Sequence, residues 1–417
     1  MRHQAATCTF ITAAFYLALI SISAIWSLDG NLSQYVRPGG ATGAPSNHIK
    51  NGFQITLDKD GVGWDGSFYF YIADDLIITD DTIKHLDMPA YRYQRIGLGL
   101  VARILSWVTA SNWVSPIHFL IASFAIIIAG VYFLARFFEV RGASPFLTLA
   151  WSIGGAPLFT LIFAFTDGAG DAFLALAIVA LLSNRFVLYL VLSAMAALCR
   201  ESLILLPLAC GTVGCIHQIA QGGDVSHRLL RGLRAGLAHT PPIIVVAAWQ
   251  IYIFARTGAF PFQFTPTTQF SFPMLSSARY FWQSIGHEIV SFYGNSSTWF
   301  PPFFSAIGIF LFSALNAILL ISLLVWISKS IKTRGNGTDA AISGLVCFGI
   351  ATCALHLCFG DVMMWIPVGY VKASSTACLI AILLVVAIRP PFLATLVAAS
   401  FANSIFGAAT IWFRLFP

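Results

Sequence analysis

The segment 63–75 carries the residues best suited to chemistry. It reads Gly-Trp-Asp-Gly-Ser-Phe-Tyr-Phe-Tyr-Ile-Ala-Asp-Asp, and Asp65 stands where a glycine-flanked loop enters an aromatic, helical stretch. On a helix, Asp65, Tyr69 and Ile72 share one face. We expect this carboxylate to face a cavity walled by aromatic rings, which suit the apolar faces of a sugar. The alternative is that Asp65 only caps the helix by accepting backbone N–H bonds.

A second polar segment, Pro-Ala-Tyr-Arg-Tyr-Gln-Arg at 89–95, directly precedes an apolar helix. Arg92 and Arg95, on either side of Tyr93, are three residues apart and lie on one face of the start of that helix. A guanidinium binds phosphate through two parallel hydrogen bonds, so the pair predicts a cradle for a lipid-linked phosphate. The alternative is interfacial anchoring to lipid headgroups, where Arg and Tyr are common.

Charged residues also interrupt the apolar sequence further along the chain. Asp167 and Asp171 join two apolar runs, where each could instead cap the next helix. Arg200 and Glu201 follow an apolar run, where ionised groups are costly unless they are paired or hydrated. Adjacent residues do not face each other on a helix, so each is expected to have its own partner, an acidic residue or a phosphate for Arg200. A purely structural buried pair is the alternative. Lys372, at a later outer end, could join the same cavity.

The composition defines the class of protein that must position these groups. Of 417 residues, 10% are charged, 58% are apolar and 14% are aromatic, whereas a soluble domain carries roughly a quarter charged residues. The chain must therefore keep most of its surface in lipid. This excludes a cytosolic enzyme, a secreted disulfide scaffold and a DNA-binding domain. The eight cysteines lie in apolar stretches without zinc-site spacing, and no basic run indicates nucleic acid as a partner.

Hydropathy predicts about eleven membrane crossings in an all-α helical bundle, because a span needs about 20 apolar residues. The first run is interpreted as a retained anchor rather than a signal peptide. The whole chain, 1–417, is expected to form one integral-membrane domain. The eleven apolar runs are 9–26, 114–137, 145–165, 172–182, 186–198, 203–219, 237–255, 303–327, 340–358, 373–388 and 392–412.

The basic residues predict the orientation of the bundle. With the N-terminus inside, the dense basic clusters fall on one side, which is the cytoplasmic side under the positive-inside rule. Because successive crossings alternate in direction, the same orientation places two long loops outside: 29–95, which holds Asp65, and 257–300, which is rich in aromatic residues. The residues suited to chemistry therefore converge on the outer side of the membrane.

The motifs also carry a resemblance to a known family. Trp64-Asp65-Gly66 with Phe68-Tyr69, Ile72-Ala73 and Asp75, followed by 89–96, resembles bacterial inner-membrane proteins implicated in cell-surface glycopolymer formation. Those proteins are similar to the GT-C superfamily of polyprenyl-phosphate-sugar-dependent glycosyltransferases, which includes the GPI mannosyltransferases. The quoted segments cover less than a fifth of the chain. Trp64 and Ser67 stand where the family pattern has Tyr and Gln, so any polar contact of that Gln is not carried over.

The resemblance implies a function. It maps the catalytic base of GT-C enzymes onto Asp65, which would accept the proton of an acceptor hydroxyl that attacks the anomeric carbon. Arg92, Arg95 or Arg200 would stabilise charge on the departing lipid phosphate. The partners are then a polyprenyl-phosphate-linked sugar donor, a glycan or lipid acceptor and membrane lipid. Some relatives use a divalent cation, Mg²⁺ or Mn²⁺, but no convincing ligand set is evident in this sequence.

Beyond the catalytic Asp65, the residues singled out above form the expected substrate-binding set. That set is Trp64, Tyr69, Asp74, Asp75, Arg92, Tyr93, Arg95, Asp167, Asp171, Arg200, Glu201 and Lys372.

Two other classes of function compete with the glycosyltransferase. A transporter or flippase for lipid-linked sugars would need charged groups on both membrane faces along a path, whereas here they gather outside. A non-catalytic subunit of a polysaccharide assembly complex would tolerate the change Asp65→Asn, whereas the enzyme would lose sugar transfer.

Overall fold

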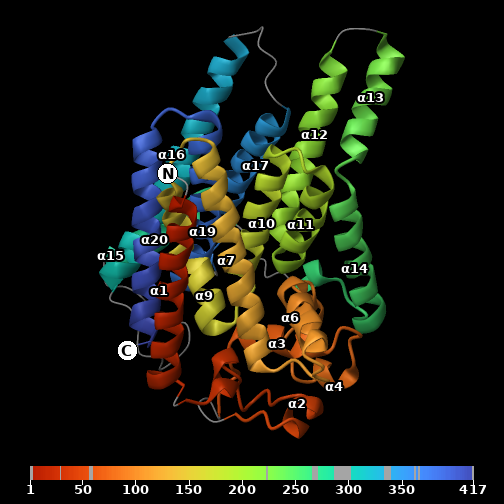
Figure 1. Ribbon diagram of the computed structural model, residues 1–417, viewed down its shortest axis with the longest axis vertical. Helices are drawn as coiled ribbons and strands as arrows, with labels where there is room; N and C mark the ends of the chain where they lie inside the picture. Colours follow the sequence, from red (N-terminus) through yellow and green to blue (C-terminus); the bar gives the residue numbers. More distant parts are fainter. Residues whose placement is uncertain are drawn as a thin grey trace.

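The computed structural model describes residues 3–28, 30–55, 60–221, 224–264, 271–285, 302–332, 340–360, 363–364 and 367–415. Within these ranges the secondary structure is helical and contains no β-strand; an isolated bridge joins Pro38 and Gly63. The predicted all-α architecture is thus confirmed for the described residues. Figure 1 shows long helices running side by side along the longest axis, with short helices gathered at the lower end.

Seven helices in the described part of the chain are long and apolar enough to cross a membrane, so the chain is an all-α, multi-pass membrane protein. These helices are long because their apolar sequences are unbroken. In lipid, every backbone group must form its hydrogen bond within its own helix. The seven helices are α1 (Gln4–Trp26), α7 (Pro116–Val140), α12 (Leu205–Ala220, preceded by the 3₁₀ turn η3, Glu201–Ile204), α16 (Pro302–Lys332), α17 (Ala340–Leu357), α19 (Pro367–Ile388) and α20 (Leu393–Leu415).

Two further spans are bent, which raises the number among the described residues to as many as nine. One consists of η2 (Pro145–Thr148) and α8 (Leu149–Ser152), followed by α9 (Gly155–Phe163) at 59°. The other joins α13 (Val225–Leu237) and α14 (Pro241–Thr257) at 55°. Two prolines open α14, and because proline lacks the N–H of a continuing helix, the break falls there.

The remaining two apolar runs form shorter helices, α10 (Asp167–Leu182) and α11 (Phe186–Cys199). Each of the eleven predicted runs therefore contains a helix. Length and composition alone, however, support seven to nine crossings within the described ranges rather than eleven. In Figure 1, α10 lies inside the bundle beside α7 and α11, where protein shields its polar first turn from lipid.

The predicted loop 29–95 is built of short helices. They are η1 (Leu32–Val36), α2 (Ser46–Lys50), α3 (Asp65–Asp74), α4 (Asp80–Ile83) and α5 (Pro89–Tyr93), and α6 (Gly97–Val108) follows them. Of the second loop, η4 (Pro261–Phe264) and α15 (Leu275–Ile285) are described, whereas 265–270 and 286–300 lie outside the described residues.

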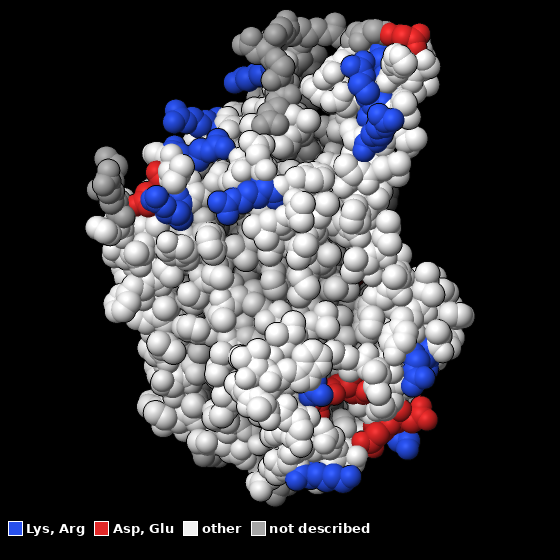
Figure 2. All heavy atoms as spheres, turned by 45° about the vertical axis from the view of Figure 1, so that its right-hand side comes forward, with Lys and Arg blue, Asp and Glu red and all other residues white. Residues whose placement is uncertain are grey.

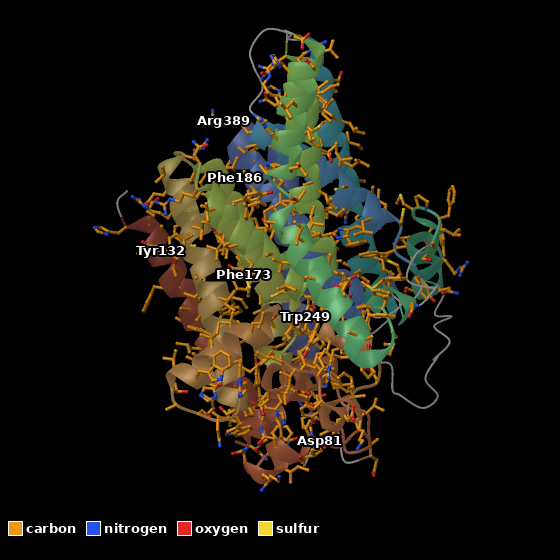
Figure 3. All side chains as sticks on the ribbon, turned by 90° about the vertical axis from the view of Figure 1, so that its right-hand side faces the viewer. Asp81, Tyr132, Phe173, Phe186, Trp249 and Arg389 are labelled. Carbon is orange, nitrogen blue, oxygen red and sulfur yellow. The ribbon has the colours of Figure 1, made fainter. Side chains whose placement is uncertain are left out.

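Charge is distributed unevenly between the two ends of the bundle. In Figure 2, basic side chains gather at the upper end and most acidic side chains at the lower end, among the short helices. Figure 3 places Arg389 near the upper end and Asp81 at the lower end. The α12–α13 hairpin, which carries Arg228, Arg231 and Arg234, projects at the upper end. Arg228, Arg231, Arg234 and Arg389 thus lie at the same end of the bundle.

Helix α3 is held deep in the lower end of the bundle. Its residues Gly66–Ala73 are all buried, although the segment lies outside the candidate spans. A Cβ at Gly66 would lie 2.0 Å from the carbonyl oxygen of Phe163, so only glycine allows α3 to approach the end of α9 this closely. Helix α9 ends at Ala164 in the left-handed conformation, and α10 begins three residues later at Asp167. This packing brings the start of α3 beside the start of α10.

Candidate functional site

Asp65 is the first residue of α3 and not its cap. The N-cap position belongs to Trp64, whose extended backbone precedes the helix and whose ring stacks on Phe163 with ring centroids 4.9 Å apart. The Asp65 carboxylate instead approaches Arg92, with Oδ1 3.0 Å from Nη2. Its side chain is 37% exposed, which leaves it accessible at the end of the bundle. The capping interpretation is therefore wrong for Asp65.

Arg92 is held from both sides by carboxylates. Its Nε and Nη2 donate to the two oxygens of Asp87 at 2.8 and 2.7 Å, and Nη2 also faces Asp65. The guanidinium lies over the ring of Phe68, 4.8 Å from its centroid, and the side chain is only 7% exposed. Because Asp87 occupies the fork of the guanidinium, Asp65 receives a single contact. No described side chain engages its second oxygen, Oδ2.

The surroundings keep Asp65 ionised. Burial by itself raises the pKa of Asp65, but the positive charges of Arg92 and Lys372 outweigh it and hold the pKa below its ordinary value. The partner responds in the opposite direction. Burial lowers the pKa of Arg92, whereas its bonds to Asp87 and its attraction to Asp65 raise it further, to well above the ordinary value. At neutral pH the site therefore holds a charged, accessible carboxylate.

A second ion pair lies beside the first. Arg95 Nε and Nη2 donate to the two oxygens of Glu201 at 2.9 and 2.7 Å, and Nη1 and Nη2 donate to the hydroxyls of Tyr69 and Tyr91. The Arg95 side chain is 12% exposed and that of Glu201 is 37% exposed. Two-point pairing fixes both partners in orientation. Unlike Asp65, Glu201 has both oxygens engaged.

A buried cluster at the start of α10 completes the site. Asp167 lies 3.5 Å from Lys372 Nζ and 3.8 Å from Arg200 Nε. Arg200 Nη1 donates to the hydroxyl of Thr376 at 2.8 Å, and that hydroxyl donates to Asp171 Oδ1 at 2.6 Å. Arg200 and the neighbouring Glu201 thus have separate partners, as the sequence predicted. Neither Asp167 nor Asp171 is the N-cap of α10, which is Thr166.

Three residues of the predicted set lie elsewhere. Asp74 and Asp75 stand at the far end of α3, about 13 Å from Asp65 by the rise of a helix. The hydroxyl of Tyr93 donates to Asp75 at 2.9 Å, so Tyr93 belongs to that end as well. We correct the grouping accordingly: the structure brings together Asp65, Arg92, Arg95, Glu201 and the α10 cluster, but not these three.

Sequence reasoning missed three partners, Asp87, Tyr91 and Thr376. Asp87 precedes Pro89, which begins α5, so the five-residue spacing to Arg92 spans a turn and matches no helical period. Tyr91 carried a signal, because it lies four residues before Arg95. Thr376 comes from α19, 176 positions beyond Arg200, and only tertiary packing reveals it.

The carboxylates of this site do not form a set of metal ligands. No group of three or more His, Cys, Asp or Glu side chains among the described residues is placed to hold a metal ion. Asp65, Asp87 and Glu201 each face a guanidinium instead. The arrangement fits hydrogen-bond donation, proton acceptance and charge stabilisation by side chains.

Comparison with known proteins gives no relative for this chain. Within the described residues, fold and site define a multi-pass, all-α membrane protein with a carboxylate–guanidinium cluster at one end of its bundle. No protein family matches its sequence, and neither a curated protein nor a solved structure is significantly similar to it.

Proposed function

We propose that the protein is a membrane glycosyltransferase of GT-C type. It transfers a sugar from a polyprenyl-phosphate donor to an extracytoplasmic glycan or lipid acceptor, with Asp65 as general base. One observation carries the proposal: Asp65 is an accessible, ionised carboxylate with one oxygen unengaged, and its neighbours are guanidinium groups that are themselves buried. The resemblance of segments 63–75 and 89–96 to glycopolymer-formation proteins supports it.

The proposed reaction is a single displacement at the anomeric carbon. An acceptor hydroxyl attacks, its proton passes to Asp65 Oδ2, and a new glycosidic C–O bond forms. The bond between the anomeric carbon and the phosphate oxygen breaks, and its electron pair stays on the polyprenyl phosphate. Direct displacement inverts the configuration at that carbon.

The cations have the complementary role. Charge that develops on the leaving phosphate is stabilised by Arg92, Arg95 and Lys372, the three cations whose charges act on Asp65. Arg200 is engaged by Thr376 and Asp167, and positions the start of α10. Because the leaving group stays anchored in lipid, the outer side of the membrane needs no nucleotide site.

The proposed topology follows the charge distribution. We place the basic upper end of Figure 2 in the cytoplasm and the short helices outside, in a bacterial inner membrane. Eleven crossings result when α10 and α11 count as short spans next to the seven long helices and the two bent pairs. This topology puts Asp65 at the extracytoplasmic end.

Transfer with purified protein tests the proposal. The full chain in detergent is incubated with a panel of polyprenyl-phosphate sugars and with the matching nucleotide sugars as controls. We expect release of polyprenyl phosphate and glycosylated acceptor from at least one lipid donor, and none from the nucleotide sugars. If folded protein turns over no lipid donor, the proposal fails, and the flippase and assembly-subunit alternatives gain weight.

A further inference from the structure

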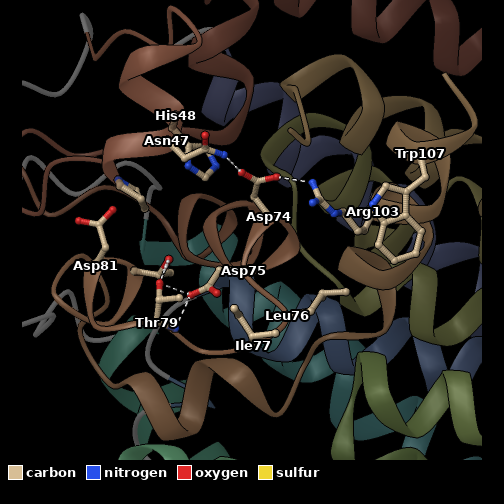
Figure 4. Close-up of a pocket in the computed structure, with 12 residues that line it drawn as sticks. Asn47, His48, Asp74, Asp75, Leu76, Ile77, Thr79, Asp81, Arg103 and Trp107 are labelled. Atoms are coloured by element: carbon tan, nitrogen blue, oxygen red, sulfur yellow. Dashed lines mark hydrogen bonds and ion pairs between the residues drawn. The ribbon is translucent and has the colours of Figure 1, made fainter. Parts of the chain in front are cut away.

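A separate pocket lies at the far end of α3. Its volume is about 480 Å³, within the range of small-molecule pockets, and Figure 4 shows the residues around it. The walls come from α2, the last turn of α3, the chain that follows it, and α6. The residues that carry the argument are Asp74, Asp75, Thr79, Arg103 and Trp107.

The pocket wall is fixed by bonds from several elements. Asp74 accepts from Arg103 at 2.7 Å and from Asn47, as the dashed lines of Figure 4 show. On the opposite wall, α14 holds the chain after α3, because Tyr252 donates to the carbonyl of Ile77 at 3.0 Å. Arg256 donates to the next carbonyl, that of Ile78, at 2.9 Å. The cavity is thus preformed.

Two polar groups on this pocket have unused hydrogen-bonding capacity. His48 is 1% exposed, yet neither ring nitrogen has a hydrogen-bond partner among the described residues. Burial lowers the pKa of His48 to about 4, so its ring is neutral, but it packs against Phe70 and Tyr71 and its nitrogens are not accessible from the cavity. All three bonds to Asp75 end on Oδ2, from Tyr93 and from the amide and hydroxyl of Thr79, and within the described structure Oδ1 accepts none.

The charges of the pocket define which ligands fit. Asp74, Asp75 and Asp81 line it, and Arg103 is the basic side chain among its lining residues. Arg103 is already engaged by Asp74 and by the carbonyl of Asn112. Phosphates and uronates are therefore repelled, whereas hydroxyl and ammonium groups find acceptors. The carboxylates do not form a metal site, because no described group of His, Cys, Asp or Glu is placed to hold one.

An aromatic surface completes the pocket. Trp107 is 58% exposed, and the Arg103 guanidinium lies over one face of its ring, 5.5 Å from the centroid. An accessible indole face beside hydrogen-bonding side chains suits the C–H face of a pyranose ring.

We propose that this pocket binds a neutral or amine-bearing saccharide. Its hydroxyl groups would bond to Asp75 Oδ1, and one sugar face would lie on Trp107. The site is distinct from the one around Asp65, about 13 Å away along α3. Its role as a holding site for an extended acceptor glycan rests on the proposed function, but saccharide binding itself does not.

Glycan-array binding of the purified full chain tests the proposal. We expect neutral or amine-bearing saccharides among the bound ligands, and neither uronate-rich nor phosphorylated ones. Titration with a bound saccharide should show that Trp107→Ala weakens Kd by at least about tenfold, and that Asp75→Asn also weakens it. Val108→Ala is the matched control, because Val108 is exposed on the same helix but does not line the pocket. An empty array, a preference for anionic saccharides, or unchanged affinity in Trp107→Ala would overturn the proposal.

A second variant separates this inference from the proposed function. Asp65→Asn should bind the saccharide with wild-type affinity, because Asp65 is at the other end of α3. If saccharide binding by the wild type depends on Trp107 but no sugar is transferred, the pocket proposal is supported and the transferase proposal is refuted. If sugar is transferred but Trp107→Ala leaves the saccharide affinity unchanged, only the pocket proposal is refuted.

Discussion

Asp87 is predicted to control the reactivity of Asp65 without reaching it. Asp87 occupies Nε and Nη2 of Arg92 at 2.8 and 2.7 Å, which limits Arg92 to one contact with Asp65 at 3.0 Å. In Asp87→Asn the amide keeps one acceptor but loses the charge. The fork of Arg92 is then free to close on both oxygens of Asp65, and it occupies the Oδ2 that would accept the proton.

The size of the effect follows from the added bond. A hydrogen bond to a charged group contributes about 1.5–3 kcal/mol. Asp65 is 37% exposed, and solvent screening reduces the value, so we take about 1.4 kcal/mol. This corresponds to about a tenfold loss in the fraction of protein with a free base. Asp87→Ala, which leaves no oxygen at position 87 to bond Arg92, should lose at least as much.

The assay is the rate of sugar transfer at saturating donor, together with KM for the acceptor. We expect kcat to fall about tenfold while KM changes little. Asp80→Asn is the control, because Asp80 is an exposed carboxylate at the start of α4 and belongs to neither ion pair. Wild-type or higher activity in both Asp87 variants would refute the reasoning.

Three further predictions concern pH, close packing and the α10 cluster. The pKa of Asp65 is held below its ordinary value, so transfer should not lose its base between about pH 8 and pH 5. The stabilising contribution of Asp65 is complete above its unfolded pKa and is lost as pH falls through the lower folded pKa, which acid unfolding of wild type and Asp65→Asn would reveal. Gly66→Ala should lower the free energy of unfolding by about 1–3 kcal/mol, measured by thermal unfolding in detergent, because its Cβ would collide with the Phe163 carbonyl. Thr376→Val should cost about 2–3 kcal/mol in the same measurement, because the fully buried Asp171 loses its donor.

Matched substitutions separate these effects from general damage. Gly214→Ala places a Cβ at an ordinary 3.9 Å from its nearest neighbour and should be tolerated. Thr352→Val removes a buried hydroxyl that donates to the Phe348 carbonyl of its own helix, and should cost much less than Thr376→Val. The predicted flat pH profile is contradicted if wild-type transfer falls between pH 8 and pH 5 and this fall is absent only in variants at Asp65. Equal stability of each variant and its control would contradict the packing predictions.

The apolar pattern predicted the helices well, because a chain in lipid must satisfy its backbone within each helix. All eleven predicted runs contain a helix, and Arg200 and Glu201 have separate partners, as their adjacency required. The length of a helix in the bundle was less predictable. The runs that became α10 and α11 are shorter than full spans, and only packing shows that protein surrounds the polar start of α10.

The grouping of the site failed where sequence proximity was taken for spatial proximity. Asp65 and Asp74 belong to one motif, but nine helical steps separate them by about 13 Å and give them different partners. Conversely, Thr376 joins the α10 cluster from α19, and no local pattern marks it. Periodicity describes one element, whereas a site assembled from several elements needs their packing.

The central claim is that Asp65 accepts the proton of the acceptor hydroxyl. Its most direct test is kcat for Asp65→Asn with purified protein and a polyprenyl-phosphate sugar that the wild type uses, with the exposed Asp60→Asn as control. A positioned general base contributes about 10²–10⁴-fold, so we predict a loss of at least about a hundredfold in Asp65→Asn, with donor binding retained, and wild-type rates in the control. Transfer by folded Asp65→Asn within about threefold of the wild-type rate would contradict the account.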